Sequence, residues 1–157
     1  SMSPELNPDP KSPDNEMLLF KRYNVQEELK RGDVVLCRNV LPTENKNFIV
    51  KRVIALEGDE VIPRRTNFGF AQEDSDEVFF EQPLIPKRIP RGFMWLEGDN
   101  QETSVDSNVY GPVPRALIEG RALYFVTSQE SRRGFFEKVA SFIPEPDRLI
   151  IGEAIPL

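Results

Sequence analysis

The sequence contains no histidine, and this absence removes several kinds of catalytic site. Ser-His and Cys-His nucleophile pairs and histidine-bound metal sites all require an imidazole ring. The single cysteine, Cys37, cannot form an internal disulfide, a redox pair or a thiolate metal site, and its place in an apolar run predicts a buried small side chain. We therefore expect neither a metal nor a cofactor, and any catalysis must come from Ser, Thr, Lys, Tyr, Asp or Glu.

Excess positive charge and long apolar runs are absent as well. The 20 Lys and Arg residues are outnumbered by 26 Asp and Glu, and a net charge of −6 without a basic-aromatic patch argues against a nucleic-acid partner. No stretch approaches the ~18 consecutive apolar residues of a membrane span, and no presequence or signal peptide is recognisable. The 157 residues suit one domain with a sizeable core, and the abrupt start suggests a soluble piece of a longer protein.

Proline, by contrast, is abundant. Its 14 copies are roughly twice the average usage, which favours short strands and turns over long helices. Residues 64–76 lack periodicity and are predicted to form an exposed insertion. Strands are predicted near residues 17–20, 34–37, 78–85, 93–96 and 122–126, and in the run that begins at Phe48 and is closed by the turn Gly58-Asp59. The predicted fold class is therefore mostly β, with antiparallel sheets.

The periodicity changes after Glu130. A helix that ends at Pro144 would place five apolar residues on one face: Phe135, Phe136, Val139, Ala140 and Ile143. The tail that follows is expected to be loose or to pair at a sheet edge. We expect this C-terminal helix and tail, residues 129–157, to pack on or extend the domain formed by residues 1–128.

The longest β-favouring run, Phe48–Val61, carries a cation on each face. Alternation places Lys51 among aliphatic residues on one face and Arg52 on the other. Each cation could simply extend its charged end to water from a half-exposed strand. Alternatively, Lys51 lies in apolar surroundings that lower its pKa from about 10.4 towards 7–8, where a neutral lysine can act as a general base. The run alone leaves both interpretations open.

A second segment, Gly98–Asn108, is crowded with short polar residues. Such residues often bond their own backbone, so one interpretation is a long turn held by Asx and Ser/Thr hydrogen bonds. The other is a support loop, in which small hydroxyls and carboxylates orient a buried cation.

Three segments, in this order along the chain, resemble the motifs of the type I signal peptidase family. Ser1-Met-Ser-Pro4 resembles the nucleophile motif, and Lys51-Arg-Val-Ile-Ala-Leu-Glu-Gly-Asp59 resembles the general-base motif. The remaining matches are Gly98-Asp-Asn100, Ser104-Val-Asp-Ser107 and Tyr110-Gly-Pro112 for the third motif, and Arg31-Gly-Asp33 for a short strand start. Together they cover most of residues 1–125, and their joint order is more specific than any one alone.

Within the family, the sequence is most similar to the mitochondrial inner membrane branch, in the form of its second catalytic subunit. Ser1–Pro8 resembles the opening of that branch, and Pro90–Asp99 resembles its Pro-Arg-Gly-x-x-Trp-x-Glu-Gly-Asp run. Gln101 and Asn108 stand where bacterial members usually have arginine. A Ser-Met pair at the first position could also remain from a removed affinity tag, although Ser3–Pro8 continues the motif in register.

The resemblance implies a Ser/Lys dyad. Ser1 would attack the scissile carbonyl to form an acyl-enzyme, with Lys51 as general base and the backbone N–H of Ser1 in the oxyanion hole. Ser104 would hydrogen-bond Lys51 and orient it. Asp106 would support the loop and the dyad, and Asp99 would fix the turn rather than touch the substrate.

The resemblance also implies a place and partners. Residues 1–128 would be the barrel-like catalytic domain of a membrane-associated serine endopeptidase, anchored in the mitochondrial inner membrane by a segment before Ser1 and facing the intermembrane space. It would remove sorting or signal segments from precursor proteins, as a heterodimer with a related first catalytic subunit. The helix with Phe135 and Phe136 could form part of the partner face, with burial on its own domain as the alternative.

Other interpretations belong to different classes. A non-catalytic or weakly active subunit that stabilises a partner signal peptidase could have lost a member of the dyad, but both are present here. A bacterial-type signal peptidase is a further alternative. A self-cleaving Ser/Lys repressor-type peptidase would need a cleavable N-terminal arm, for which the sequence offers no candidate, and a β-barrel binding module would leave Lys51 inert.

Overall fold

Short strands dominate the computed structural model, which describes residues 17–22, 24, 28–41, 47–64, 85–126 and 137–153. The strands are β1 (Met17–Lys21), β2 (Val34–Arg38), β3 (Phe48–Ala55), β4 (Glu60–Val61), β5 (Lys87–Arg88), β6 (Phe93–Glu97), β7 (Val113–Pro114), β8 (Ile118–Val126), β9 (Glu137–Lys138) and β10 (Leu149–Ile150). The helical elements among these residues are α1 (Ser107–Tyr110), η1 (Arg115–Leu117) and η2 (Pro146–Arg148). No helix in these ranges is long and apolar enough to cross a membrane.

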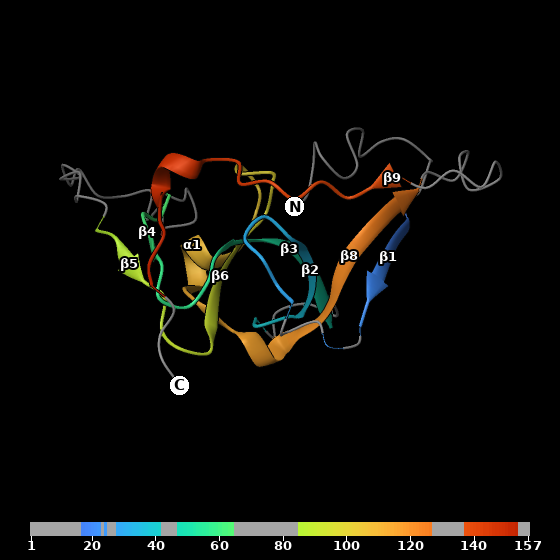
Figure 1. Cartoon of the computed structure of the whole chain (residues 1–157), viewed down its shortest axis with the longest axis horizontal. Coiled ribbons are helices and arrows are strands. Elements are labelled where there is room, and N and C mark those ends of the chain that lie inside the picture. The colour runs from blue at the N-terminus through green and yellow to red at the C-terminus, as the bar shows by residue number, and fades with distance from the viewer. Residues whose placement is uncertain are drawn as a thin grey trace, which may run out of the picture.

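The strands form two antiparallel sheets, which confirms the predicted mostly β fold. The larger sheet has the order β1-β8-β2-β3-β6-β7, and β9 also pairs with β8. The smaller sheet has the order β10-β4-β5. In Figure 1 the larger sheet occupies the centre and right of the view, whereas β4 and β5 lie at its left.

β3 has a central place in the larger sheet because both of its edges are paired. It pairs with β2 on one side, where Val35 is the register partner of Lys51, and with β6 on the other, where Glu97 is the partner of Arg52. A strand rich in β-branched residues suits a pleated surface that is buried on both faces. The predicted central run is therefore an interior strand.

The two faces of β3 pack into different parts of the core. The face of Lys51 and Val53 belongs to a cluster formed by Leu29, Val35, Cys37, Val53, Met94, Leu96, Val113 and Ile118. On the opposite face, Ile54 packs in a cluster with Val61 and Trp95. Burial of such side chains stabilises the fold by about 1.5–3 kcal/mol each. Cys37 is fully buried, as predicted.

The predicted C-terminal helix is wrong over residues 137–143, the part of it that the structure describes. Glu137 and Lys138 form β9, which pairs with Phe125 and Tyr124 of β8, and residues 139–143 are not helical. The edge of β8 supplies backbone hydrogen-bonding partners, and these outweigh a local 3.6-residue pattern. The helix residues before Glu137, with Phe135 and Phe136, lie outside the described residues, as does the proposed use of this helix as a partner face.

The other sequence predictions have mixed outcomes. The tail pairs at a sheet edge, since Leu149 of β10 is the register partner of Val61. α1 was not predicted, because its four residues are too few to show a helical period. The predicted insertion beyond Arg64 and the predicted strand before Ile85 lie outside the described residues.

Candidate active site

Lys51 is buried in the middle of β3, with 3% of its surface exposed. Its Nζ donates a hydrogen bond to Oγ of Ser104 at 2.8 Å. Removal from water holds the pKa of Lys51 below its ordinary value, although the negative charges of Asp106 and Asp99 act in the opposite direction. The amine is therefore shifted towards its neutral form, which can accept a proton.

The loop that carries Ser104 is held by the carboxylate of Asp106. This carboxylate accepts the backbone N–H of Gly98 at 2.9 Å and that of Asn108 at 3.0 Å, and it caps the start of α1. Ser107 Oγ accepts the backbone N–H of Leu96 at 2.9 Å, which ties the loop to β6. The segment is thus both an Asx-type turn and the support of a buried cation, so the two interpretations from sequence are compatible.

Arg52 is buried on the opposite face of β3 and binds Asp99. The guanidinium donates from Nε and Nη2 to the two carboxylate oxygens at 2.9 and 2.7 Å, and neither side chain is more than 5% exposed. The carboxylate of Asp99, at the start of the loop, is therefore bound by Arg52. Neither cation of the run extends to water, because Lys51 is 3% and Arg52 0% exposed.

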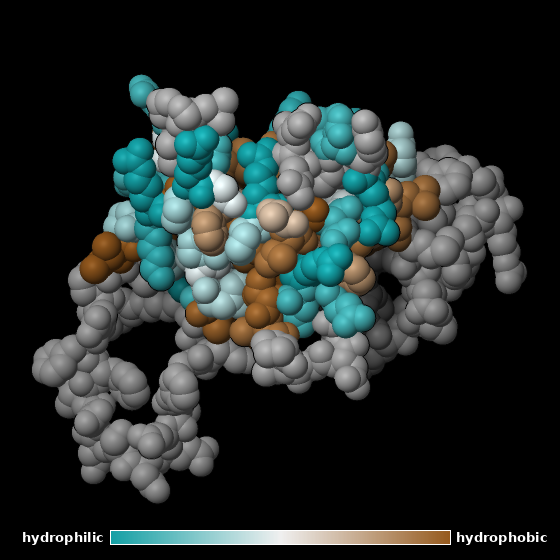
Figure 2. Space-filling model, turned by 90° about the horizontal axis from the view of Figure 1, so that it is seen from below, coloured by the Kyte–Doolittle hydropathy of each residue, from teal (hydrophilic) through white to brown (hydrophobic). Residues whose placement is uncertain are grey.

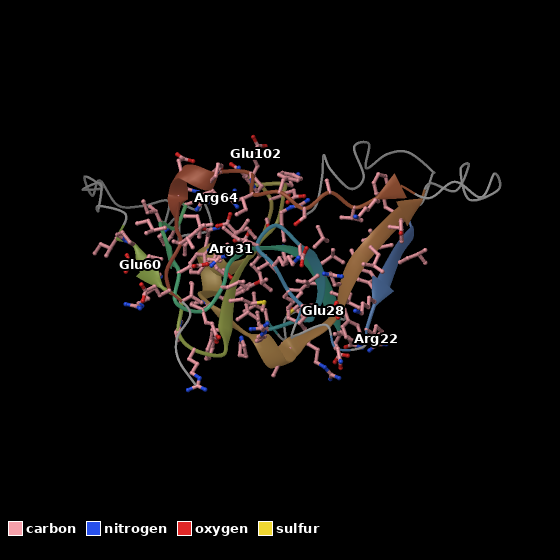
Figure 3. All side chains as sticks on the ribbon, viewed as in Figure 1. Arg22, Glu28, Arg31, Glu60, Arg64 and Glu102 are labelled. Carbon is pink, nitrogen blue, oxygen red and sulfur yellow. The ribbon has the colours of Figure 1, made fainter. Side chains whose placement is uncertain are left out.

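A buried cluster around Glu97 was missed from the sequence. Glu97 is 3% exposed, and its carboxylate accepts from Trp95 Nε1 at 2.8 Å and from Arg64 and Arg148 at 2.7 Å each. Arg64 also lies 3.9 Å from Asp106, and its position is labelled in Figure 3. The arginines are 33 and 51 residues from Glu97, so no local pattern could have linked them.

Tyr110, the last residue of α1, has a buried hydroxyl without a hydrogen-bond partner among the residues described. Burial raises the pKa of this phenol, and the charge of Asp106 adds to the rise, so the hydroxyl stays protonated. The same holds for Cys37, where burial raises the pKa of the thiol to about 12, with a contribution from Glu119. Neither group is activated as a nucleophile.

The structure brings together three of the five predicted site residues. Ser104 contacts Lys51 directly, and Asp106 holds the Ser104 loop. Asp99 belongs to the same loop but is bound from the other face of β3. Ser1 lies outside the described residues, so the dyad itself stays a prediction. No group of His, Cys, Asp and Glu suited to a metal ion occurs in the described ranges.

In a comparison with known proteins, residues 1–127 match the family described as "Signal peptidase, peptidase S26". Human mitochondrial inner membrane protease subunit 1 is 38% identical over 96 residues, 61% of this chain and 49% of that protein. Mouse mitochondrial inner membrane protease subunit 2 is 35% identical over 149 residues, 94% of this chain and 71% of that protein. Subunit 2 from Saccharomyces cerevisiae is 30% identical over 80% of this chain and 63% of its own length. The chain thus spans about half the length of the human relative.

Proposed function

Since the chain belongs to the signal peptidase family, peptidase S26, we propose that it is a serine endopeptidase with a Ser1/Lys51 dyad. The observation that carries this proposal is the buried Lys51, whose pKa is lowered and whose Nζ is oriented by Ser104 Oγ at 2.8 Å. A lysine in apolar surroundings can act as a general base near neutral pH, which a solvent-exposed lysine cannot. With no histidine in the chain, the base that most often activates a serine hydroxyl is absent.

The geometry at Lys51 suits proton transfer. A neutral amine has two N–H bonds and one lone pair, and one N–H is directed to Ser104 Oγ. The lone pair is then free to take the proton of the Ser1 hydroxyl while Ser1 Oγ bonds to the scissile carbonyl carbon. The protonated Lys51 returns a proton to the leaving amine and is neutral again. It then takes a proton from the water that attacks the acyl-enzyme carbonyl, and it returns that proton to Ser1 Oγ as the ester bond breaks.

The edge of β3 next to Lys51 supports an extended peptide as substrate. Among the described strands, residues Phe48–Lys51 pair with β2 only, whereas Arg52 pairs with both β2 and β6, and Val53 and Ala55 pair with β6. A strand edge that lacks a second neighbour can hydrogen-bond an extended segment through its backbone. We propose that the segment is the sorting or signal sequence of a precursor protein.

The names of the relatives support a place and partners for this chain. Those relatives are named as subunits 1 and 2 of a mitochondrial inner membrane protease. We propose that this chain acts at the mitochondrial inner membrane, on the side of the intermembrane space, as a heterodimer with a related first subunit. Exposed large hydrophobic side chains such as Leu19, Phe48 and Ile85 are consistent with contacts beyond this chain. Figure 2 shows hydrophobic residues among hydrophilic areas on one face of the molecule.

A covalent serine probe tests this proposal on the full-length protein with its partner subunit present. Ser1→Ala should abolish both labelling and precursor cleavage. Ser3→Ala is the matched control, because it removes a nearby hydroxyl and keeps Ser1, and it should retain both. Labelling that persists in Ser1→Ala would refute Ser1 as the nucleophile. An unmodified protein that neither labels nor cleaves, yet is required for cleavage by its partner, would indicate the non-catalytic subunit instead.

A further inference from the structure

Residues 140–148 follow β9 and precede β10, and they are called the C-terminal strap below. The strap lies beyond residues 1–127, the range that matches the family. In Figure 1 this part of the chain crosses the top of the view from β9 to η2. Its contacts are with groups that flank Lys51 and the Ser104 loop.

The first set of contacts is with Arg52, the neighbour of Lys51 on β3. Nη1 of Arg52 donates to the carbonyl oxygen of Ala140 at 2.8 Å, and Cζ lies 4.0 Å from the centre of the Phe142 ring. A cation over an aromatic face is an attractive contact, and it is stronger when the cation is desolvated, as Arg52 is. The strap therefore covers the guanidinium that binds Asp99.

The second set of contacts is with the start of the Ser104 loop. Arg148 donates from Nη2 to Glu97 and from Nη1 to the carbonyl oxygen of Ile62, at 2.7 and 2.6 Å. Glu145 accepts a hydrogen bond from Gln101. Three alternate residues of the loop start are thus held by the strap: Glu97 and Gln101 directly, and Asp99 through Arg52.

The loop between these anchors and Ser104 has little other support. Gln101, Glu102 and Thr103 are exposed, and the backbone N–H of Ser104 donates to the carbonyl of Asn100 at 3.0 Å. Beyond Ser104, Asp106 holds the far end of the loop through the N–H of Gly98. The position of Ser104 Oγ thus depends on where residues 97–101 are held.

We propose that the C-terminal strap is a positioning element of the active site, which keeps Ser104 Oγ within hydrogen-bonding distance of Lys51 Nζ by holding residues 97–101 at the start of the loop. This inference rests on the proposed peptidase function. Phe142 and Arg148 are positioning residues in this scheme, because they act through Arg52 and Glu97 and do not touch Lys51.

Loosening the strap should have a specific consequence for Lys51. If the loop shifts, water can reach the amine of Lys51 and solvate its charged form. The pKa of Lys51 then rises towards its ordinary value. The described charges that act on Lys51, Asp106 and Asp99, already favour the charged form, so they would not oppose this rise. The chemical step should slow while substrate binding at β3 stays intact.

Arg148→Gln in the full-length protein is the test, with Arg22→Gln as the matched control. Arg22 also pairs with a glutamate, Glu119, but its side chain is 64% exposed. In Figure 3 it lies on the opposite side of the view from Arg64, which binds the same glutamate, Glu97, as Arg148 does. We expect Arg148→Gln to lower kcat by about tenfold or more with KM changed less than about twofold, and to move the acidic limb of the pH–kcat profile to higher pH. Arg148→Lys should recover part of kcat, and Arg22→Gln should change neither.

A second measurement separates this inference from the peptidase proposal. Carbon NMR of labelled lysine side chains reports the pKa of Lys51 without any turnover, and it should be higher in Arg148→Gln than in the unmodified protein. If Arg148→Gln does not fold, Phe142→Leu takes its place, because it keeps apolar bulk and removes the ring below Arg52. A folded variant with unchanged Lys51 pKa and unchanged kcat would overturn the role of the strap. Absence of cleavage by the unmodified protein would overturn the peptidase proposal, and the NMR result alone would then decide the role of the strap.

Discussion

At the scale of single residues, the protonation of Lys51 controls the proposed reaction. Its folded pKa lies below its unfolded value of about 10.4, because burial disfavours the charged amine. Cleavage should therefore rise with pH through the folded pKa, and no histidine can imitate this rise. The pH dependence of kcat/KM measures it, and a profile that is flat from acid to neutral pH would contradict the assignment.

The same pKa has a consequence for stability. Below the folded pKa both states carry the proton, so the folded state bears the full cost of burying a charge. Between the folded and the unfolded pKa of Lys51, the unfolded chain binds the extra proton, and the free energy of unfolding from this group rises with pH.

Lys51→Met tests both effects with one substitution. Methionine has a similar size and no charge, so cleavage should be lost while stability is kept or improved. Thermal melting at several pH values and a precursor cleavage assay measure the two outcomes. Near-normal cleavage by Lys51→Met would refute the dyad and leave the non-catalytic subunit as the better interpretation.

Ser104→Ala and Asp106→Ala should differ in what they damage. Ser104→Ala removes the oxygen that orients Lys51, so turnover should fall while melting is little changed. Asp106→Ala leaves the buried N–H of Gly98 without its acceptor, at a cost of about 1–3 kcal/mol, and the partly buried N–H of Asn108 as well, so it should harm both turnover and stability. Normal melting and normal cleavage in Asp106→Ala would show that this carboxylate does not support the site.

At the scale of elements, the approach of the strap to the turn before β2 depends on Gly32. Gly32 has φ of +89°, and a Cβ added there would lie 2.7 Å from the backbone N of Phe142. Gly92 is a matched control, since its φ is +77° but a Cβ would meet nothing within 4 Å. Gly92→Ala should lower the free energy of unfolding by about 1 kcal/mol from backbone strain alone. Gly32→Ala should cost clearly more in denaturant unfolding, and equal costs would mean that the strap is free to move away.

At the scale of the whole molecule, Asp59 joins the two sheets. Its buried carboxylate accepts from both Nε and Nη2 of Arg31 at 2.7 Å, and from the backbone N–H groups of Leu56 and Gly152 at 2.9 Å. Arg31 precedes β2 of the larger sheet, and Gly152 follows β10 of the smaller one. Burial raises the pKa of Asp59, but the hydrogen bonds from Arg31 and the backbone outweigh it, and the net pKa is lowered.

Arg31→Ala should therefore lower the free energy of unfolding by about 3 kcal/mol, because it leaves a buried carboxylate without its partner. Arg38→Ala, which breaks an exposed pair with Glu119, should cost much less, because solvent screens that pair. The stabilisation linked to Asp59 is present above its unfolded pKa and is lost as the pH falls through its lower folded pKa. Acid unfolding followed by circular dichroism should show a weaker pH dependence in Arg31→Ala, and an unchanged acid transition would contradict this account.

The sequence by itself determined the local features of this protein. Alternation in the run that begins at Phe48 predicted β3, because strand periodicity depends only on neighbouring residues. The absence of histidine limited the chemistry to a few residue types, and the order of the motifs pointed to the family. The hydrogen bond between Ser104 and Lys51 was anticipated only through the family resemblance, since 53 residues separate the two.

Only the tertiary structure decided which cations are buried and what holds them. Lys51 could have reached water from a half-exposed strand, and its burial depends on residues of other elements, such as its register partner Val35 and its hydrogen-bond partner Ser104. Arg52 donates a hydrogen bond to the carbonyl oxygen of Ala140, which is 88 residues away in a segment whose own pattern predicted a helix. Glu137 and Lys138 of that segment form a strand instead, because the edge of β8 offers backbone hydrogen bonds that no local sequence window contains. Solvent exclusion and long-range pairing depend on which elements meet in space, and no local pattern of residues along the chain shows which elements these are.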